Sequence, residues 1–464
     1  MKDTQQNLDT IKWLKNSIIA LAIAVLYSIA LVLLRTPQLS HFVTDKSMMF
    51  KVALVIHVNL SVLVWLLSIM AMSWSLNKYK TGFENIYSIL AFLGTVSMAL
   101  SPLYPELVPV MNNYIPMLEN IVFIAGLSLF GAGVLCFAVQ TVFTSFIKCY
   151  RGYGGRLIAI TNFTSSLMFI LVWFCFALSY KQLDALVEII PLDLDFYYEM
   201  LYWSGGHLLK FIYTQLLMIV LLLLAEGWKG GEIKFSLLYE VLLALNFFLS
   251  LAVFVGHARF DLADGVFKEF YKLHMIYTGG IVPTIFIALL YFEVFQARKK
   301  NIVGFIPISF FASSLLFLSS RLIGMVISEV NVAILAHYHC SIAGISVALM
   351  GLSYLVCFSY KVKDSINDNL GVVSKLLVFI QKDSQQKGMK TASWQILILT
   401  VGQFLHVAGL AFAECYGVLK KIPGGDIILS AKTYMGIVGG GGLVDIIGSL
   451  MFVYICVRNL YLLK

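Results

Sequence analysis

The chain has 464 residues, of which 60% are hydrophobic and 12% are charged, and its mean hydropathy is +0.87. Soluble globular domains carry about 25% charged residues, so this composition excludes an ordinary soluble protein and predicts an integral membrane protein. The formal net charge of +8 does not indicate nucleic-acid binding, because the basic residues are distributed along the chain as in membrane proteins, in alternate loops.

Apolar segments follow one another from one end of the chain to the other. Each is long enough to cross the hydrocarbon core of a bilayer, which takes about 20 helical residues. They predict an all-α integral membrane fold in which residues 1–464 form a single domain of twelve transmembrane helices. The predicted spans are 12–34, 48–74, 86–104, 118–145, 157–179, 199–227, 235–257, 274–297, 305–328, 336–360, 391–414 and 434–460.

The basic residues predict the orientation of these helices. Most lysines and arginines fall in alternate loops, and cytoplasmic loops carry the excess of positive charge. Both termini are therefore expected in the cytoplasm, in a bacterial inner membrane. The first helix has no cleavage site after it and is expected to stay as a transmembrane helix.

Five of the eight histidines lie near the beginnings of the predicted helices two, six, eight and ten. Even-numbered helices run from outside to inside, so all five imidazoles are expected at one depth, in the outer part of the membrane. Imidazole is a common ligand of heme iron and copper, and this layer favours metal binding over packing alone. The five residues are His57, His207, His274, His337 and His339.

His337 and His339 are two positions apart, with Tyr338 between them. At 3.6 residues per turn this spacing places them about 200° apart around the helix. They should face opposite sides of the helix, which would let it ligate two different metal centres.

These histidines lie in segments that resemble subunit I of the heme-copper oxidase superfamily. The segment AHYHCSIAGISVALMG at 336–351 is similar to that family's helix ten with its H-x-H motif. The resemblance implies that His337 is the proximal ligand of a high-spin heme, where a gas is reduced. It implies that His339 and His57, the latter in VIHVN at 55–59, are the axial ligands of a low-spin heme.

The resemblance also implies a second metal. WSGGH at 203–207 is similar to the W-x-x-G-H sequence that carries the first ligand of the copper called CuB, and LHMIYTG at 273–279 is similar to the entry into helix eight. His207 and His274 would thus ligate copper, or non-heme iron. The outer loop carries Lys420 and Lys421 where the family has paired arginines that hold heme propionates.

Two departures from the family pattern concern the second metal. The family has a histidine pair before helix eight, and here its first member is Leu273. A third ligand could come from His257, Glu269 or Tyr271, all expected in the loop before that helix, and a carboxylate would favour iron. The other departure is Phe211, where many oxygen-reducing members have a tyrosine; Tyr213, Tyr271, Tyr277 and Tyr338 are the alternatives near in sequence.

The resemblance implies the core catalytic subunit of a respiratory terminal reductase. Two hemes and the second metal would reduce O2 to water, with electrons from a partner subunit, a cytochrome c or quinol. Nitric oxide reduction is nearly equal in weight, because joining two NO molecules needs no phenol. From other classes, a non-catalytic heme-binding protein or an ion transporter remains open. No nucleic acid is expected as a partner.

Several other polar side chains are expected within helices. Lys210 either extends to the near interface or acts beside the reduced gas. Glu240, Glu293, Arg321 and Asp445 are candidates for a proton path. His406, in the eleventh helix, is expected to pack or to support a ligand.

Overall fold

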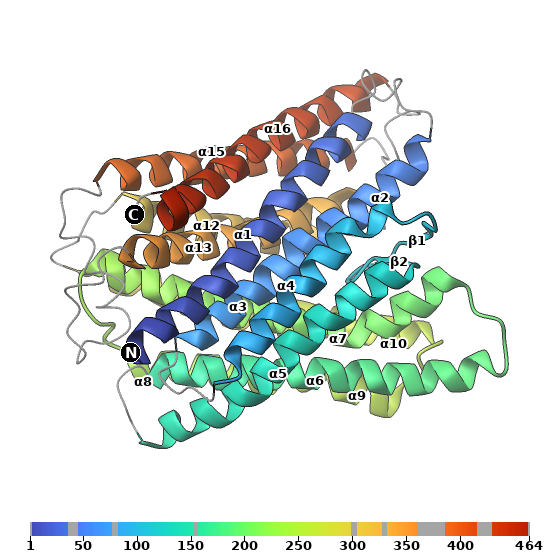
Figure 1. Cartoon of the computed structure of the whole chain (residues 1–464), viewed down its shortest axis with the longest axis horizontal. Helices are drawn as coiled ribbons and strands as arrows, with labels where there is room; N and C mark the ends of the chain where they lie inside the picture. The colour runs from blue at the N-terminus through green and yellow to red at the C-terminus, as the bar shows by residue number, and fades with distance from the viewer. Residues whose placement is uncertain are drawn as a thin grey trace. The chain divides into compact units, whose positions relative to one another are not determined.

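The computed structural model describes residues 2–35, 45–76, 82–151, 156–297, 304–326, 332–360, 386–414 and 429–462. Within these ranges, twelve helices are long and apolar enough to cross a membrane. The predicted number of twelve apolar spans is therefore confirmed, and Figure 1 shows the helices that form them. Both the direction in which these helices cross the membrane and the single-domain organisation stay predictions.

The chain divides into two compact units. The first unit comprises Met1–Ser17, Val58–Ile219 and Ile233–Phe295, and the second comprises Ile18–His57, Val220–Glu232 and Gln296–Lys464. The helices α1 and α7 each contribute residues to both units. In lipid every backbone N–H and C=O must be paired within the protein, which explains why the spans are helical.

The first unit contains most of the elements up to residue 295. Two helices belong to it in part: α1 (Lys2–Arg35) up to residue 17 and α7 (Leu194–Lys229) up to residue 219. The other elements, in chain order, are η2 (Asn59–Val64), α3 (Trp65–Ser75), α4 (Glu84–Leu100), η3 (Ser101–Leu103), β1 (Pro109–Val110), β2 (Met117–Leu118), α5 (Ile121–Arg151), α6 (Arg156–Val187), α8 (Ser236–Ser250), α9 (Val253–Arg259), α10 (Gly265–Tyr277) and α11 (Ile281–Phe295).

Within this unit α4 packs on α5, α5 on α6, and α6 on α8. Gly94 of α4 faces Gly126 of α5, and a Cβ on Gly126 would lie 2.7 Å from the backbone nitrogen of Met98. The two helices therefore touch backbone to backbone, as small residues allow in membranes. In the chain, α4 is followed by the antiparallel hairpin of β1 and β2, in which Pro109 pairs with Leu118, and then by α5.

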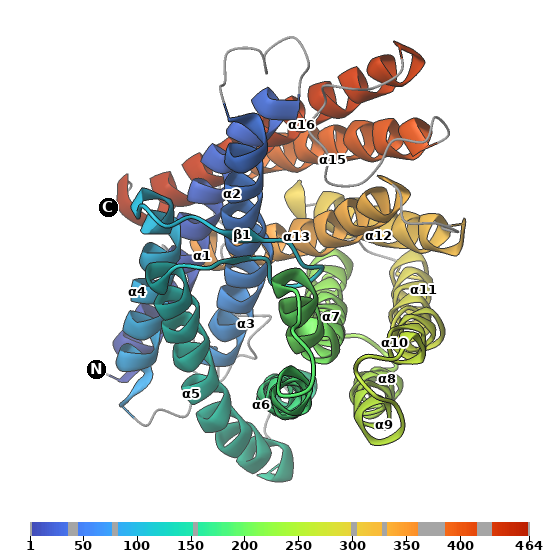
Figure 2. The same ribbon diagram turned by 90° about the vertical axis from the view of Figure 1, so that its right-hand side faces the viewer.

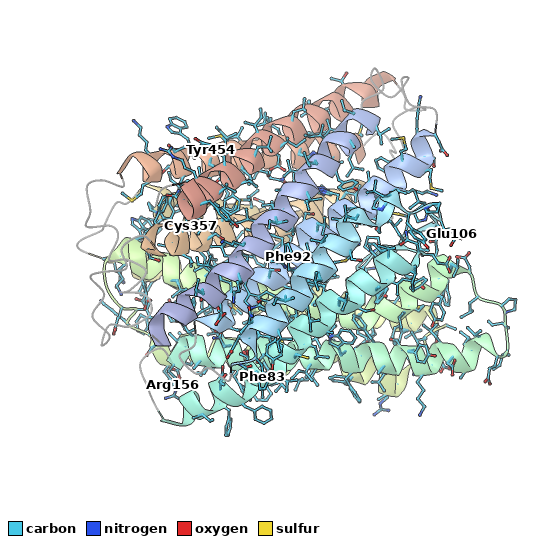
Figure 3. All side chains as sticks on the ribbon, in the orientation of Figure 1. Phe83, Phe92, Glu106, Arg156, Cys357 and Tyr454 are labelled. Carbon is cyan, nitrogen blue, oxygen red and sulfur yellow. The ribbon has the colours of Figure 1, made fainter. Side chains whose placement is uncertain are left out.

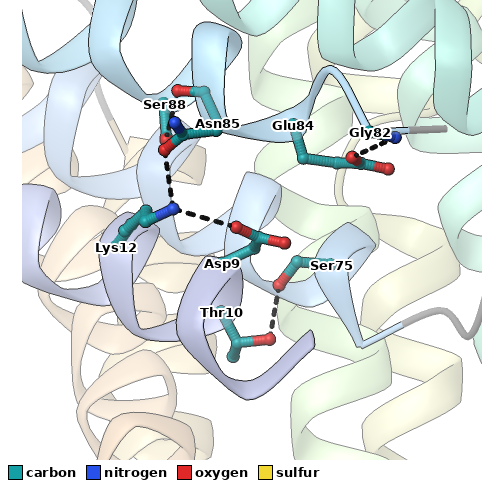
Figure 4. A network of polar contacts seen from close by, with 8 residues as sticks. All are labelled: Asp9, Thr10, Lys12, Ser75, Gly82, Glu84, Asn85 and Ser88. Carbon is teal, nitrogen blue, oxygen red and sulfur yellow. Dashed lines mark hydrogen bonds and ion pairs between the residues drawn. The ribbon is translucent and has the colours of Figure 1, made fainter. Parts of the chain in front are cut away.

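A polar network joins the beginning of α1 to its neighbours in the first unit (Figure 4). The ammonium of Lys12 donates to Asp9 at 3.2 Å and to Asn85 of α4 at 2.6 Å. The hydroxyl of Ser75, at the end of α3, donates to Thr10 at 2.8 Å. These bonds fix one end of α1 to α3 and α4.

The second unit contains α2 (Lys46–Val58) up to His57, the later part of α1, α12 (Phe305–Val326), α13 (Val332–Tyr360), α15 (Gln386–Glu414), α16 (Leu429–Val457) and η7 (Arg458–Leu462). Figure 2 shows α15 and α16 side by side. A Cβ on Gly402 of α15 would lie 2.6 Å from the backbone nitrogen of Asp445, and Gly441 of α16 faces the backbone of His406 just as closely.

The glycines of the run at 439–442 differ in how closely they approach another helix. Gly441 lies against α15, whereas a Cβ on Gly440 would meet nothing within 4 Å.

Large apolar side chains lie on the outer surfaces of the helices. Phe83, Phe92 and Tyr454 are exposed, whereas Cys357 is buried (Figure 3). Exposed aromatic side chains in such number would be costly in water and suit contact with lipid tails.

One predicted boundary is wrong. The eighth span begins at Gly265, nine residues before the predicted start, so Glu269 and Tyr271 lie on α10 and not in a loop; likewise His257 lies on α9. Asp264 caps α10 by accepting the N–H of Val266 at 3.0 Å. Charged residues on the exposed face lower the local hydropathy and hide this helix from a count of apolar residues.

Candidate functional site

The candidate ligand histidines share one contact, a ring nitrogen beside a backbone carbonyl. A carbonyl oxygen only accepts hydrogen bonds, so that nitrogen carries the proton and the other carries the lone pair of the neutral ring. Metal-ligating histidines are oriented in this way. The Nδ1 atoms of His57, His207, His337 and His339 lie 3.0, 2.9, 2.7 and 2.9 Å from the carbonyls of Ala24, Trp203, Ser320 and Leu335. In His274 the nitrogen beside a carbonyl is Nε2, and His406, expected only to support a ligand, has the same contact between Nδ1 and Val438 at 2.9 Å.

His337 is held between α13 and α12 of the second unit. Its Nδ1–H donates to the carbonyl of Ser320 on α12. The ring lies over Gly324, where a Cβ would be only 2.9 Å from Nδ1. A glycine is therefore required at 324 for this position of the imidazole.

His339 faces a different helix. Its ring centroid lies 4.8 Å from that of His406 on α15, with 40° between the planes. Its Nδ1–H donates to Leu335, one turn earlier on α13. His337 therefore contacts α12 and His339 contacts α15, as their angular separation predicts. His406 packs against a candidate ligand, which agrees with a supporting role.

His57 lies at the end of α2, half-buried, with its Nδ1–H donating to Ala24 of α1. Two residues after His57, at Asn59, the π-helical segment η2 begins inside the same membrane span. Such segments are rare and are frequent at functional sites. The sequence does not predict this local widening of the helix.

His207 and His274 lie together in the first unit. Both are buried, at 3% and 7% exposure, on helices α7 and α10, which meet where the ring of Tyr271 lies 5.0 Å from that of His207. The Nε2–H of His274 donates to the carbonyl of Leu249 at 2.9 Å. Its Nδ1 is buried and has no hydrogen-bond partner among the described residues, so a lone pair is left for a ligand.

Tyr114 is a site residue that the sequence does not reveal. Its hydroxyl lies 2.7 Å from Nδ1 and 3.1 Å from Nε2 of His207. It comes from the tip of the β1–β2 hairpin, 93 residues away along the chain. No motif marks it, because only the folding of this hairpin onto α7 brings the phenol to the imidazole.

The motif at 203–207 explains how the phenol fits. A Cβ on Gly206 would collide with the ring of Tyr114, and a Cβ on Gly205 would collide with Phe176. Trp203 meets the Tyr114 ring edge to face at a centroid distance of 5.6 Å. The ammonium of Lys210 lies over the same ring, 4.9 Å from its centroid, which is a cation–π contact.

The polar groups of the three residues considered as further metal ligands have other partners. Both ring nitrogens of His257 are hydrogen-bonded to side chains, those of Gln182 at 3.1 Å and Ser204 at 2.8 Å. Glu269 is exposed and forms an ion pair with Lys272 at 3.3 Å. The hydroxyl of Tyr271 donates to the carbonyl of Val253 at 2.6 Å, although its ring lies 5.0 Å from that of His207.

Within the described ranges, no three residues of the types His, Cys, Asp and Glu are grouped so that they could hold a metal ion. Lys420 and Lys421, expected at heme propionates, lie outside the described residues.

The two departures from the family pattern have distinct geometries. Leu273 is 42% exposed, so its side chain points away from the buried face that His274 occupies. Phe211 is fully buried and stacks on His274, with centroids 4.9 Å apart and 25° between the planes. Of the alternative phenols, Tyr277 is exposed and Tyr213 is buried.

Two of the charges considered for a proton path have structural partners. Glu240 pairs with Arg156 at 3.2 Å. Glu293 is buried and accepts the backbone N–H groups of Lys234 and Phe235 just before α8. A proton path stays a prediction.

Proteins from two organisms resemble the chain over most of its length. The uncharacterized protein RP382 of Rickettsia prowazekii (strain Madrid E) is 39% identical over 510 aligned positions, which cover 97% of this chain and 96% of that protein. The chain belongs to the same family as this protein. A second member of the comparison, an uncharacterized protein of Aquifex aeolicus (strain VF5), is 26% identical over 368 positions, 79% of this chain and 88% of its own length. No family model matches the chain.

Proposed function

We propose that this chain is the heme-binding core subunit of a membrane terminal reductase that reduces O2 to water. The observation that carries the proposal is the shared contact of the histidines. In each candidate axial ligand, His57, His337 and His339, a backbone carbonyl fixes the proton on Nδ1. The lone pair is thereby fixed on Nε2, the atom that would bind heme iron.

The resemblance of 336–351 and 203–207 to the heme-copper oxidases supplies the assignment of roles. His337 would hold the high-spin heme, and His339 with His57 the low-spin heme. His207 and His274 would hold a second metal, copper or non-heme iron. When bound, these groups supply the electron transfer and the reduction of the gas.

The residues of the chain bind and orient these groups. Helices α12 and α13 fix the His337 ring through Ser320 and Gly324. Helix α7 and the hairpin fix the His207 ring through Trp203 and Tyr114. Buried apolar surroundings exclude water and strengthen charge interactions. Electrons would come from a partner subunit, a cytochrome c or quinol.

Nitric oxide reduction is the second candidate, and the stack of Phe211 on His274 favours it. A phenyl ring at this place can give neither an electron nor a proton. The joining of two NO molecules to N2O takes two electrons and two protons but does not need a phenol to supply them. The hydroxyl of Tyr114 beside His207 favours O2, because it supplies a phenol from another part of the chain.

The test is to purify the full chain from membranes and measure metals, optical and EPR spectra, and turnover of O2 and of NO. Two hemes with one copper or non-heme iron and O2 consumption support the proposal. The same metals with N2O formation and no O2 consumption support the second candidate. Two hemes alone indicate a non-catalytic heme protein, and absence of heme and metal refutes both, leaving the ion transporter.

A further inference from the structure

We propose that a cavity of the first unit, between α5, α6 and α7, binds an acyl chain of a phospholipid that enters from the side, between α5 and α6. The cavity has a volume of about 370 Å³. All the residues that line it belong to the first unit. The inference goes beyond the proposed function and does not depend on hemes or a second metal.

The first observation is the lining of the cavity. None of the residues that line it is charged or a histidine. A site without charges or imidazoles does not suit a metal ion or a polar metabolite, whereas it suits a hydrocarbon. The buried apolar side chains of its inner wall include Leu63 of η2, Leu67 of α3, Phe130 of α5, Phe169 of α6 and Leu209 of α7.

The second observation is the position of the opening. The lining residues Ser128 of α5 and Ala177 and Tyr180 of α6 are exposed. They lie within two helices that are long and apolar enough to span a membrane, so in a bilayer the opening faces lipid tails. An empty cavity forfeits dispersion contacts along its walls. A tail that enters it regains these contacts.

The third observation is the shape and size of the cavity. On α6 the lining runs from Phe169 to Tyr180, which is about 16 Å along the helix axis. The volume of about 370 Å³ is more than twice the roughly 150 Å³ that holds a benzene molecule, so it takes about a dozen carbon atoms. A long apolar cavity of this size favours a chain over a compact ring.

The fourth observation is a lysine beside the opening. Lys181 follows Tyr180 and lies one turn beyond Ala177, so it continues the same face of α6. It is exposed and forms no ion pair within the ranges that the structure describes. The span Arg156–Val187 has 32 residues, about twelve more than the hydrocarbon core needs. Its last turns, with Lys181, therefore reach the level of the lipid phosphates, which attract a lysine.

The cavity is separate from the candidate site at His207. Tyr202 and Leu209 line it from α7, and they lie seven residues apart on one side of that helix. His207 is turned by about 140° from Tyr202 around the same axis. A variant that fills the cavity should therefore leave the surroundings of His207 unchanged.

The experiment compares the full-length wild-type protein with variants that close, fill or spare the cavity. Ala177→Phe closes the opening, and Leu209→Phe fills the interior from α7. Ala185→Phe is the matched control, because Ala185 is exposed on α6 and does not line the cavity. Lys181→Gln removes only the charge beside the opening.

Each protein is delipidated in detergent and mixed with dioleoylphosphatidylglycerol, and native mass spectrometry counts the bound lipid. A second sample receives the same lipid with a photoreactive diazirine in one acyl chain, and the cross-linked peptides are identified. Lipids and quinones that remain after purification from membranes are extracted and identified. Thermal unfolding shows whether each variant is folded.

We expect the wild type and Ala185→Phe to retain one phospholipid, cross-linked to the lining segments of α6 and α7. Ala177→Phe and Leu209→Phe should bind it about tenfold more weakly, because the added ring occupies the space of the chain. Lys181→Gln should bind it about fivefold more weakly, which is the contribution of one lysine near lipid phosphates.

Three results would overturn the inference. One is equal lipid retention in Ala185→Phe and in both cavity variants. Another is cross-linking confined to residues outside the cavity, which indicates only the lipid that surrounds the protein. The third is a quinone recovered in place of the phospholipid, or xenon binding in the cavity of a protein that retains no lipid. The proposed function would stand in each case, because its own test counts hemes and metals.

Discussion

The two units hold their candidate ligands by different means. In the second unit, His57, His337 and His339 all donate Nδ1–H to backbone carbonyls of helices. In the first unit, His207 has the side chain of Tyr114 as an additional partner, and His274 has an orphaned Nδ1. Backbone carbonyls are present in any helix, whereas the phenol depends on one hairpin.

The units also use glycine differently. Gly441 in the second unit brings one helix backbone against another, whereas Gly206 in the first unit makes room for the ring of Tyr114. The second unit thus holds its candidate ligands by helix backbone alone, whereas the first adds a side chain from a distant segment, Tyr114, to His207.

The largest expected effect tests the ligands of the second unit. His337→Ala should abolish the high-spin heme signal and leave the low-spin signal, and His339→Ala or His57→Ala should do the reverse, because each removes an axial ligand. Optical and EPR spectra measure this. His257→Ala, in which both ring nitrogens have side-chain partners in the wild type, should keep both signals. Equal loss of both signals from one well-folded variant would contradict the two-heme assignment.

The next effect tests whether the second unit depends on backbone contact. Gly441→Ala should lower the stability by about 1–3 kcal/mol, because the added methyl group meets the backbone of α15 and cannot be accommodated by a rotamer change. Gly440→Ala, on the same helix with open space around it, should be neutral or slightly stabilising. Thermal unfolding in detergent measures both. Equal midpoints would show that this contact does not limit stability.

A comparable effect tests the use of side chains in the first unit. Glu293→Ala leaves the N–H groups of Lys234 and Phe235 without their acceptor, at a cost of about 1–3 kcal/mol. Glu293→Gln keeps an acceptor oxygen, so it should lower the stability less than Glu293→Ala does.

The smallest expected effect is that of the control in the same unit. Glu269→Ala breaks only an exposed ion pair with Lys272, which contributes about 0–1 kcal/mol. If Glu269→Ala destabilised the protein as much as Glu293→Ala, the distinction between the two carboxylates would be wrong.

Part of the site can be predicted from sequence. The order of the membrane helices follows from runs of apolar residues, because a bilayer demands helices of a fixed minimum length. The divergence of His337 and His339 follows from the helical repeat, and the structure places them against α12 and α15. The start of α10 could not be found in this way, because its exposed face is charged.

The sequence by itself determined an all-helical membrane protein and which of its histidines are candidate metal ligands. Both follow from local composition and from the helical repeat. Only the tertiary structure decided which ring nitrogen of His57, His274 and His337 carries the proton, because the accepting carbonyls belong to other helices. It also decided that Leu273 faces outward and that Tyr114 reaches His207, since contacts across 93 residues of chain arise from packing and leave no local pattern.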